Sequence, residues 1–95
     1  MGGNKNMRSL LERTRDEMLK DIHWTSKTLA ILLYHTTKVE ENPRWSYAQT
    51  GRDLNMSRAY ISENIMLGRL LKIKPEIIHL SRAKALNVVR GHLVV

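Results

Sequence analysis

The sequence of 95 residues contains no cysteine, so the chain can form neither a disulfide bond nor a thiolate metal site. This absence fits a reducing compartment. No apolar run approaches the roughly 20 residues that a membrane-spanning helix needs. Residues 1–8 are polar and lack the apolar core and the cleavage site of a signal peptide. We therefore expect a cytoplasmic protein of a bacterium, plasmid or phage, with no membrane partner.

Proline is scarce as well, because Pro43 and Pro75 are the only two, and each stands where a helix is expected to begin or end. No internal repeat or low-complexity stretch divides the chain. A chain this short has room for one domain with a small core and a modest reserve of stability. We predict an all-α fold, with a disordered N-terminus over residues 1–8 and a single domain of about five helices over residues 9–95.

Basic residues outnumber acidic ones, and the excess lies in the second half of the chain. Residues 1–43 hold 7 Lys and Arg against 6 Asp and Glu, whereas residues 44–95 hold 9 against 3. The formal net charge is therefore +1 for the first half and +6 for the second, which add up to the total of +7. Such a basic half is typical of a surface that binds a polyanion.

Two helices are predicted in the nearly neutral first half. Ser9 and Glu12 form a capping box, in which each side chain accepts a hydrogen bond from the other residue's backbone, at the start of a helix over residues 9–22. A second helix is expected over residues 25–40, before Pro43. Their apolar positions, with the two tryptophans, are expected in the core: Leu10, Leu11, Met18, Leu19, Trp24, Leu29, Ala30, Leu32, Leu33, Tyr34 and Trp45.

The segment over about residues 46–71 has the pattern of a helix-turn-helix. Ser46 and Gln49 form a second capping box, which starts a short helix over residues 47–54. Gly51 is small, as a steep crossing of two short helices requires near their turn. Asn55 follows four residues later and tolerates the left-handed backbone that a sharp turn needs.

The second helix of this motif is predicted to begin after Ser57, whose hydroxyl offers an N-terminal cap. Ile61, Ile65 and Leu67 provide an apolar side that holds the helix to the body. Its other side is then free to enter the major groove of a duplex.

The C-terminal quarter is expected to contain one more helix. Pro75 suits the first turn of a helix over about residues 76–89, and Gly91 is expected to end it. Residues 92–95 form a short apolar tail that should dock on the core or pair with a second copy. We predict a homodimer that associates through the first helix, the last helix or this tail.

The segment RAYISENIMLGRLLKIKPEI, residues 58–77, resembles the helix-turn-helix of ParB/KorB-type partition and repressor proteins. In that family a serine-capped recognition helix of the form S-R-x-Y-[VI]-S precedes a Leu-rich stretch and then L-P-x-E-[IV]. The resemblance covers about residues 45–78 and implies sequence-specific recognition of duplex DNA. Three positions depart from the family: Asn55 replaces a usual Gly, Asn64 replaces an apolar residue, and Gly68 interrupts the helix. The family's nucleotide-binding domain is absent, so nucleotide-driven clamping is not implied.

DNA contacts are predicted in two groups, because base edges give sequence preference whereas phosphates give affinity and register. The base-reading group is Ser57, Arg58, Tyr60, Ser62 and Glu63. The phosphate group is Arg44, Ser46, Tyr47, Gln49, Arg52, Arg69, Lys72 and Lys74. Alternatives stay open. Tyr60 is a core or rim residue in one of them, and Glu63 keeps the helix soluble or pairs with Arg58 or a Lys in a neighbouring turn. Arg69, Lys72 and Lys74 are an ordinary solvated face in another.

The leading hypothesis is a sequence-specific double-stranded DNA-binding protein, such as a transcriptional repressor, that binds an inverted repeat as a homodimer. The alternative is a protein-binding or structural module, such as a polymerase or nuclease adaptor or a phage DNA-packaging recognition subunit. The four histidines have no metal-ligand spacing. No catalytic grouping or phosphate-cradling loop is present. We therefore expect no metal, no cofactor, no small-molecule ligand and no enzymatic activity.

Overall fold

The computed structural model describes residues 9–19 and 23–94, with side chains as far as Gly91. Within these ranges the chain forms five α-helices, one 3-10 helix and no strand, which confirms the predicted all-α fold. The elements in chain order are α2 (Leu10–Leu19), α3 (Trp24–Glu41), α4 (Tyr47–Leu54), α5 (Arg58–Ile73), the 3-10 helix η1 (Pro75–His79) and α6 (Arg82–Val94). None of the helices in these ranges is long and apolar enough to cross a membrane.

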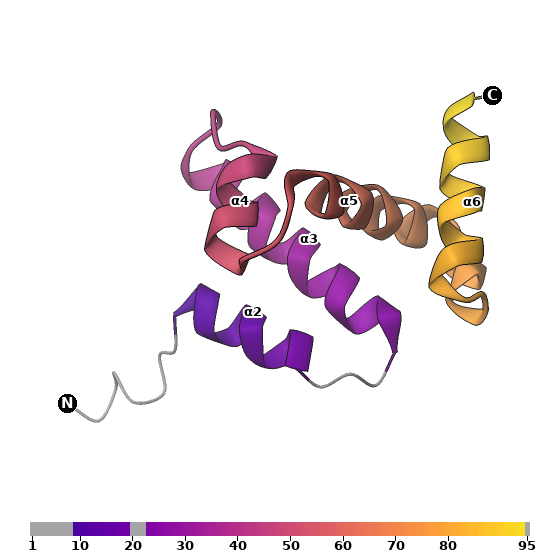
Figure 1. The fold of residues 1–95 in the computed structure, drawn as a ribbon, viewed down its shortest axis with the longest axis horizontal. Helices are drawn as coiled ribbons and strands as arrows, with labels where there is room; N and C mark the ends of the chain where they lie inside the picture. The colour runs from indigo at the N-terminus through magenta and orange to yellow at the C-terminus, as the bar shows by residue number, and fades with distance from the viewer. Residues whose placement is uncertain (1–8, 20–22, 95) are drawn as a thin grey trace.

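Helix α3 lies at the centre of the arrangement. It packs against α2 on one side and against α4 and α5 on the other, as Figure 1 shows. Helix α6 stands across the far end of α5. Because α5 contacts α3, α4, η1 and α6, it connects the two ends of the molecule.

The predicted capping box at the start of α2 is confirmed. The backbone N–H of Glu12 donates to Oγ of Ser9 at 3.1 Å, and the backbone N–H of Ser9 donates to Oε1 of Glu12 at 3.4 Å. The predicted end of this helix, residues 20–22, and the predicted disordered residues 1–8 lie outside the described ranges.

A first hydrophobic cluster, here called the turn core, lies where α3, α4 and the first half of α5 meet. Its buried members are Ile31, Leu32, Tyr34, Leu54, Ile61 and Ile65. Leu10, Leu11 and Met18 of α2 pack against it and are partly buried. Fully burying one such aliphatic side chain contributes about 1.5 to 3 kcal/mol relative to leaving it exposed. Ile61 and Ile65 of the predicted apolar side of α5 therefore meet the buried residues of α3 in this cluster.

A second cluster, here called the C-terminal core, lies where the end of α5 meets η1 and α6. Its buried members are Leu67, Leu70, Leu71, Ile77, Ala85, Leu86 and Val89. Trp24, the first residue of α3, packs against this cluster. Its indole Nε1 donates a hydrogen bond to the backbone oxygen of Leu80 at 2.9 Å. One residue from the first half of the chain is thus fixed to the loop that precedes α6.

The prediction of one helix over residues 76–89 is wrong at both ends. Helix η1 gives way to extended backbone at Leu80, whose carbonyl is held by the indole of Trp24. Ser81 then begins a new helix, because its Oγ accepts a hydrogen bond from the backbone N–H of Lys84 at 3.3 Å. Gly91 does not end α6, which continues to Val94; no described glycine has a positive φ, so the left-handed cap that glycine often supplies is not formed.

Three leucines that the sequence assigned to the core are exposed. The exposed fractions are 79% for Leu19, 40% for Leu29 and 61% for Leu33. The apolar run from Leu29 to Tyr34 spans more than one full turn of helix, so its members point to all sides. The neighbours of α3 bury Ala30, Ile31, Leu32 and Tyr34 but leave Leu29 and Leu33 on the surface.

Candidate nucleic-acid interface

Helix α4 has the bounds and the start that the sequence predicts. Oγ of Ser46 accepts a hydrogen bond from the backbone N–H of Gln49 at 3.2 Å. In return the backbone N–H of Ser46 donates to Oε1 of Gln49 at 2.8 Å, which completes the capping box. Trp45 precedes the cap, and its Nε1 donates to Oγ1 of Thr50 at 2.8 Å. These contacts fix where α4 begins and how the chain enters it.

The turn after α4 also has the predicted geometry. Asn55 has φ 59° and ψ 49°, the left-handed conformation, and no other described non-glycine residue has a positive φ. A Cβ atom on Gly51 would stand 2.5 Å from the backbone oxygen of Met56. The backbone N–H of Met56 in turn donates to the oxygen of Gly51 at 2.8 Å. The small residue and the left-handed residue are both required, because the chain folds back directly onto α4.

Helix α5 begins beside a shallow, open depression. Oγ of Ser57 accepts a hydrogen bond from the backbone N–H of Tyr60 at 3.1 Å, so the predicted cap is confirmed. The residues around the depression come from α4, the turn and the start of α5: Ala48, Gly51, Arg52, Asn55, Met56, Ser57 and Arg58. The depression brings two arginines next to the N-terminal end of a helix of 16 residues. Free N–H groups and the helix dipole favour an anion there.

One side of α5 faces outward and carries polar groups. Arg58, Ser62 and Arg69 are separated by four and seven residues, which places them on the same side of the helix. Arg58 and Arg69 are exposed and Ser62 is half-buried. Ala59 is exposed beside them; we did not predict it, although its spacing of three residues from Ser62 indicates the same side. This outward face is the part of α5 that can approach a duplex.

The structure turns two of the five predicted base-reading residues toward α6 instead. Tyr60 is half-buried, and the guanidinium carbon of Arg82 lies 4.8 Å from the centre of its ring. The carboxylate of Glu63 forms ion pairs with Arg82 at 3.4 Å and with Arg90 at 3.8 Å. Tyr60 therefore packs at the rim of a core, and Glu63 pairs with arginines of α6 rather than with Arg58. No local pattern in the sequence could have revealed these contacts across the fold.

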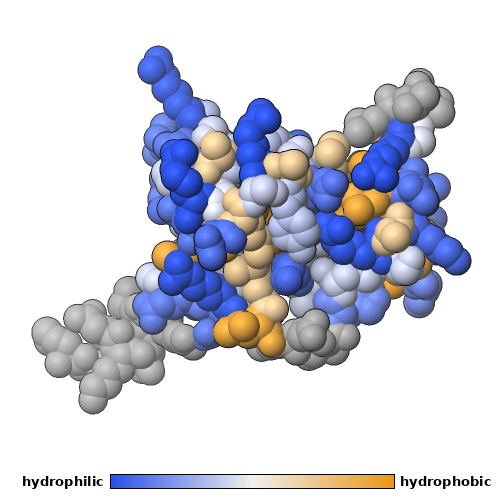
Figure 2. Space-filling model, in the orientation of Figure 1, coloured by the Kyte–Doolittle hydropathy of each residue, from blue (hydrophilic) through white to orange (hydrophobic). Residues whose placement is uncertain are grey.

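The predicted phosphate-contacting residues differ in their exposure. Six of them are exposed: Arg44, Ser46, Arg52, Arg69, Lys72 and Lys74. Tyr47 and Gln49 are half-buried and have structural contacts, because Gln49 caps α4 and the ring of Tyr47 lies 4.8 Å from the ring of His35. Figure 2 shows a mainly hydrophilic face over α4 and α6, with hydrophobic residues only in small patches.

A buried polar network holds α4 on α3. Thr50 is fully buried, and its Oγ1 accepts from Nε1 of Trp45 and lies 2.7 Å from Nδ1 of His35. Burial lowers the pKa of His35, and the positive charge of Arg69 lowers it further. The ring is therefore neutral at pH 7, and its Nδ1 can accept the proton of the Thr50 hydroxyl.

A second contact joins α4 to α3 and α2. The hydroxyl of Tyr34 donates to Oδ2 of Asp53, and Arg15 donates to the backbone oxygen of the same aspartate at 3.1 Å. Burial of Tyr34, together with this hydrogen bond to Asp53, raises the pKa of its hydroxyl. Helix α4 is thus held at its start and at its end, so the turn that follows it has a fixed position.

Two of the three departures from the ParB/KorB pattern, Asn64 and Gly68, lie at the contact of α5 with α3. A Cβ atom on Gly68 would stand 2.8 Å from Cδ2 of Leu32, so a glycine allows the two helices to approach closely. Asn64 is fully buried; its Oδ1 accepts from the hydroxyl of Thr28 at 2.7 Å and its Nδ2 donates to the backbone oxygen of Tyr60 at 2.9 Å. Gly68 does not interrupt α5, which runs through it to Ile73.

The described residues contain no group of three or more His, Cys, Asp or Glu side chains that could hold a metal ion. Their arrangement offers hydrogen-bond donors and cations on the outward face of α5 and around the turn, which suits the binding of an anionic polymer. The absence of a cofactor and of enzymatic activity stays a prediction from the sequence.

Comparison with known proteins does not place the chain in a family. No protein-family model, no curated protein and no solved structure matches it at a significant level. The resemblance to the ParB/KorB-type module over residues 45–78 therefore stays a prediction from the sequence, and the functional argument depends on the geometry described above.

Proposed function

We propose that the protein binds double-stranded DNA in a sequence-specific manner, with α5 in the major groove. The observation that carries this proposal is the outward face of α5, where Arg58, Ser62 and Arg69 point away from both cores. This helix follows α4 through a left-handed turn at Asn55 and begins at an exposed serine cap. Helix-turn-helix proteins use this relation to bring the start of the second helix to base edges.

Base edges are assigned to the first two turns of the outward face. The guanidinium of Arg58 can pair with O6 and N7 of a guanine, and the hydroxyls of Ser57 and Ser62 can bond to either type of base pair. The methyl group of Ala59 can contact the methyl group of a thymine. The two predicted residues that α6 engages are left out of this assignment, because their side chains are committed to contacts inside the molecule.

Phosphate contacts are assigned to the exposed polar groups that flank this face. Arg44 and Ser46 stand at the start of α4, and Arg52 stands on its last turn. Arg69, Lys72 and Lys74 follow along and just beyond the second half of α5. These groups provide affinity and register without sequence information.

A transcriptional repressor or regulator of a phage, plasmid or bacterium fits this proposal, and such a protein would act in the cytoplasm. A module this small binds weakly alone, so we retain the prediction of a homodimer on an inverted repeat, whose half-sites lie about 34–36 Å apart per helical turn. The side chains of the predicted apolar tail, residues 92–95, lie outside the described ones. Sedimentation velocity of the free protein would measure the state of association.

Duplex binding over a series of salt concentrations tests the proposal. The logarithm of the association constant should fall with the logarithm of salt concentration, with a slope near 0.9 per neutralised phosphate. Arg58→Ala should reduce discrimination between a preferred duplex and a random one by about 1 to 3 kcal/mol. Arg13→Ala removes an exposed arginine of α2 and should leave this discrimination unchanged. Unchanged discrimination in Arg58→Ala would show that α5 does not read the bases.

A protein-binding or structural module is the second candidate, and the exposed leucines of α3 favour it. Leu29 and Leu33 lie one helical turn apart, and Leu33 borders a groove between α2 and α3 that also includes Leu10 and Ala30. Apolar side chains in a groove are a common feature of protein interfaces. If the protein binds no duplex even at low salt, this second function is favoured over the first.

A further inference from the structure

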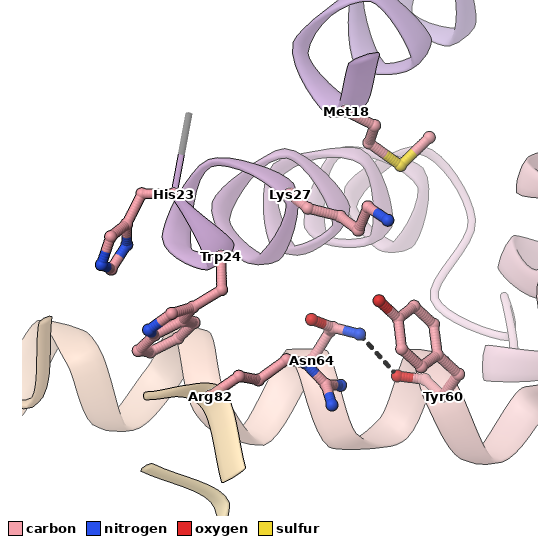
Figure 3. A pocket seen from close by; sticks show the side chains of 7 residues that line it. All are labelled: Met18, His23, Trp24, Lys27, Tyr60, Asn64 and Arg82. Atoms are coloured by element: carbon pink, nitrogen blue, oxygen red, sulfur yellow. Dashed lines mark hydrogen bonds between the residues drawn. The ribbon is translucent and has the colours of Figure 1, made fainter. Parts of the chain in front are cut away.

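A cavity of about 360 Å³ lies behind α5, on the side opposite to its outward face. Residues of α2, α3, α5 and α6 line it together with His23, which precedes α3. The volume falls within the range of about 300 to 1,000 Å³ that is usual for small-molecule sites. Figure 3 shows side chains from three of these helices turned toward the same space. Neither the turn nor the outward face of α5 contributes to this cavity.

The cavity is rich in positive charge. Lys27 of α3 and Arg82 of α6 line it, and none of the lining residues within the described ranges is acidic. Both are half-buried. Arg82 is partly compensated by Glu63 at 3.4 Å, whereas Lys27 has no ion pair with a carboxylate of the described residues. Two cations held at one half-enclosed space repel each other, and an anion between them removes that repulsion.

The walls of the cavity are aromatic and its floor is polar. Trp24 lies on one side, with the ring of His23 5.5 Å from its own, and Tyr60 lies on the other side under the guanidinium of Arg82. The amide of Asn64 forms the floor and is fixed by its hydrogen bonds to α3 and α5. Rigid aromatic walls favour a planar guest, because flat rings stack on them without ordering flexible side chains.

We propose that this cavity binds a small planar anion, an aromatic ring that carries a carboxylate or a phosphate group. The ring would lie against Trp24, because the guanidinium of Arg82 already covers a face of the Tyr60 ring. The anionic group would reach the ammonium of Lys27 and the guanidinium of Arg82. Charge-assisted hydrogen bonds of this kind are the stronger ones in proteins. The site stands apart from the proposed DNA-binding face, so it does not depend on the proposed function.

Nuclear magnetic resonance of the full-length, ¹⁵N-labelled chain tests this site directly. The two tryptophans give two indole N–H signals, of which Trp24 lies in the cavity and Trp45 lies at the start of α4. Benzoate and phenyl phosphate should shift the Trp24 signal in a saturable manner and leave the Trp45 signal in place. Benzyl alcohol, which has the ring without the charge, and acetate, which has the charge without the ring, should bind roughly tenfold more weakly.

Two variants separate the role of the cation from a general loss of charge. Lys27→Met keeps the length of the side chain and should weaken benzoate binding roughly tenfold. Lys84→Met removes an exposed lysine of α6 outside the cavity and should bind as the unchanged protein does. Saturable binding of either aromatic anion supports the proposal, and the tighter one identifies carboxylate or phosphate as the preferred group. The proposal is overturned if neither anion shifts the Trp24 signal at millimolar concentration, if benzyl alcohol binds as tightly as benzoate, or if Lys27→Met binds benzoate unchanged.

Discussion

The turn region and the C-terminal region of this protein are held together by different kinds of contact. Around the turn, short-range contacts set the path of the backbone: the Ser46–Gln49 capping box, the backbone bond from Met56 to Gly51 and the cap at Ser57. Contacts with α3 and α2 then hold α4 in place, but they do not determine where along the chain the turn lies. In the C-terminal region the defining contacts cross the fold. Trp24 donates to a residue 56 positions further along the chain, and Glu63 pairs with an arginine 19 positions away.

Because of this difference, the local structure of the turn region is encoded by a short stretch of sequence, whereas that of the C-terminal region is not. A capping box or a left-handed turn requires only neighbouring residues, so its stability is encoded within a few positions. The C-terminal core forms only when α3, α5 and α6 are already close together. The turn sets the position of α5, which contacts both ends of the molecule, so we expect changes in the turn region to act on the whole fold. We expect changes in the C-terminal contacts to act mainly on η1 and α6.

The largest effect is expected for Gly51→Ala. The new Cβ would stand 2.5 Å from the backbone oxygen of Met56, and backbone cannot move aside as a flexible side chain can. We expect a loss of about 2 kcal/mol or more in the free energy of unfolding, measured by urea denaturation. Gly91→Ala is the matched control, because no atom lies within 4 Å of its new Cβ and alanine favours a helix over glycine by up to about 1 kcal/mol. Equal stability losses in both variants would contradict the close contact at the turn.

The next effect is expected for Asn64→Ala, which breaks the polar contact between α3 and α5. The variant leaves the buried hydroxyl of Thr28 without its acceptor, at a cost of about 1 to 3 kcal/mol. The double variant Thr28→Val with Asn64→Leu removes both polar groups and should recover most of this loss. If the double variant is less stable than the single one, Thr28 and Asn64 stabilise the fold by more than the hydrogen bond between them.

A smaller and more local effect is expected for Trp24→Phe. Phenylalanine keeps the aromatic contact with the C-terminal core but removes the hydrogen bond to Leu80, which is worth about 1 kcal/mol. Amide hydrogen exchange should become faster in η1 and α6 and remain unchanged in α4. Equal acceleration in α4 would show that the two regions do not open separately.

The smallest effect is expected for acidification around His35. Because the folded state has the lower pKa, the unfolded chain takes up a proton first as pH falls below about 6.5, and stability declines from there until the folded state is protonated too. His35→Asn can retain a hydrogen bond to Thr50 and should show a shallower decline, measured as the free energy of unfolding between about pH 7 and pH 5. An equally steep decline in this variant would assign the pH dependence to other groups.

The difference between short-range contacts and contacts across the fold also decides how much of the fold could be predicted from the sequence. The bounds of α4, the caps at Ser9, Ser46 and Ser57 and the left-handed Asn55 were predicted because each depends on local backbone chemistry. The sequence pattern does not predict the break between η1 and α6, although Ser81 offers a capping signal, because Pro75 already suits the first turn of a helix.

The residues of the candidate site also form two groups, one placed by local helical spacing and the other by contacts across the fold. The outward position of Arg58 and Ser62 follows from helical spacing after a serine cap. The inward position of Tyr60 and Glu63 depends on Arg82, and only the folded position of α6 reveals it. Asn64 and Gly68, which depart from the helix-turn-helix pattern, are explained by the approach of α3, which the segment alone does not contain.

Selection from a random pool of duplexes tests the proposed role of α5 most directly. The unchanged protein should enrich a defined motif, with two-fold symmetry if it binds as a dimer. Arg58→Ala should relax the preference at one base pair of each half-site and keep the remaining positions. An identical motif for both proteins, or no enrichment with the unchanged protein, would contradict the assignment of α5 as the helix that reads DNA.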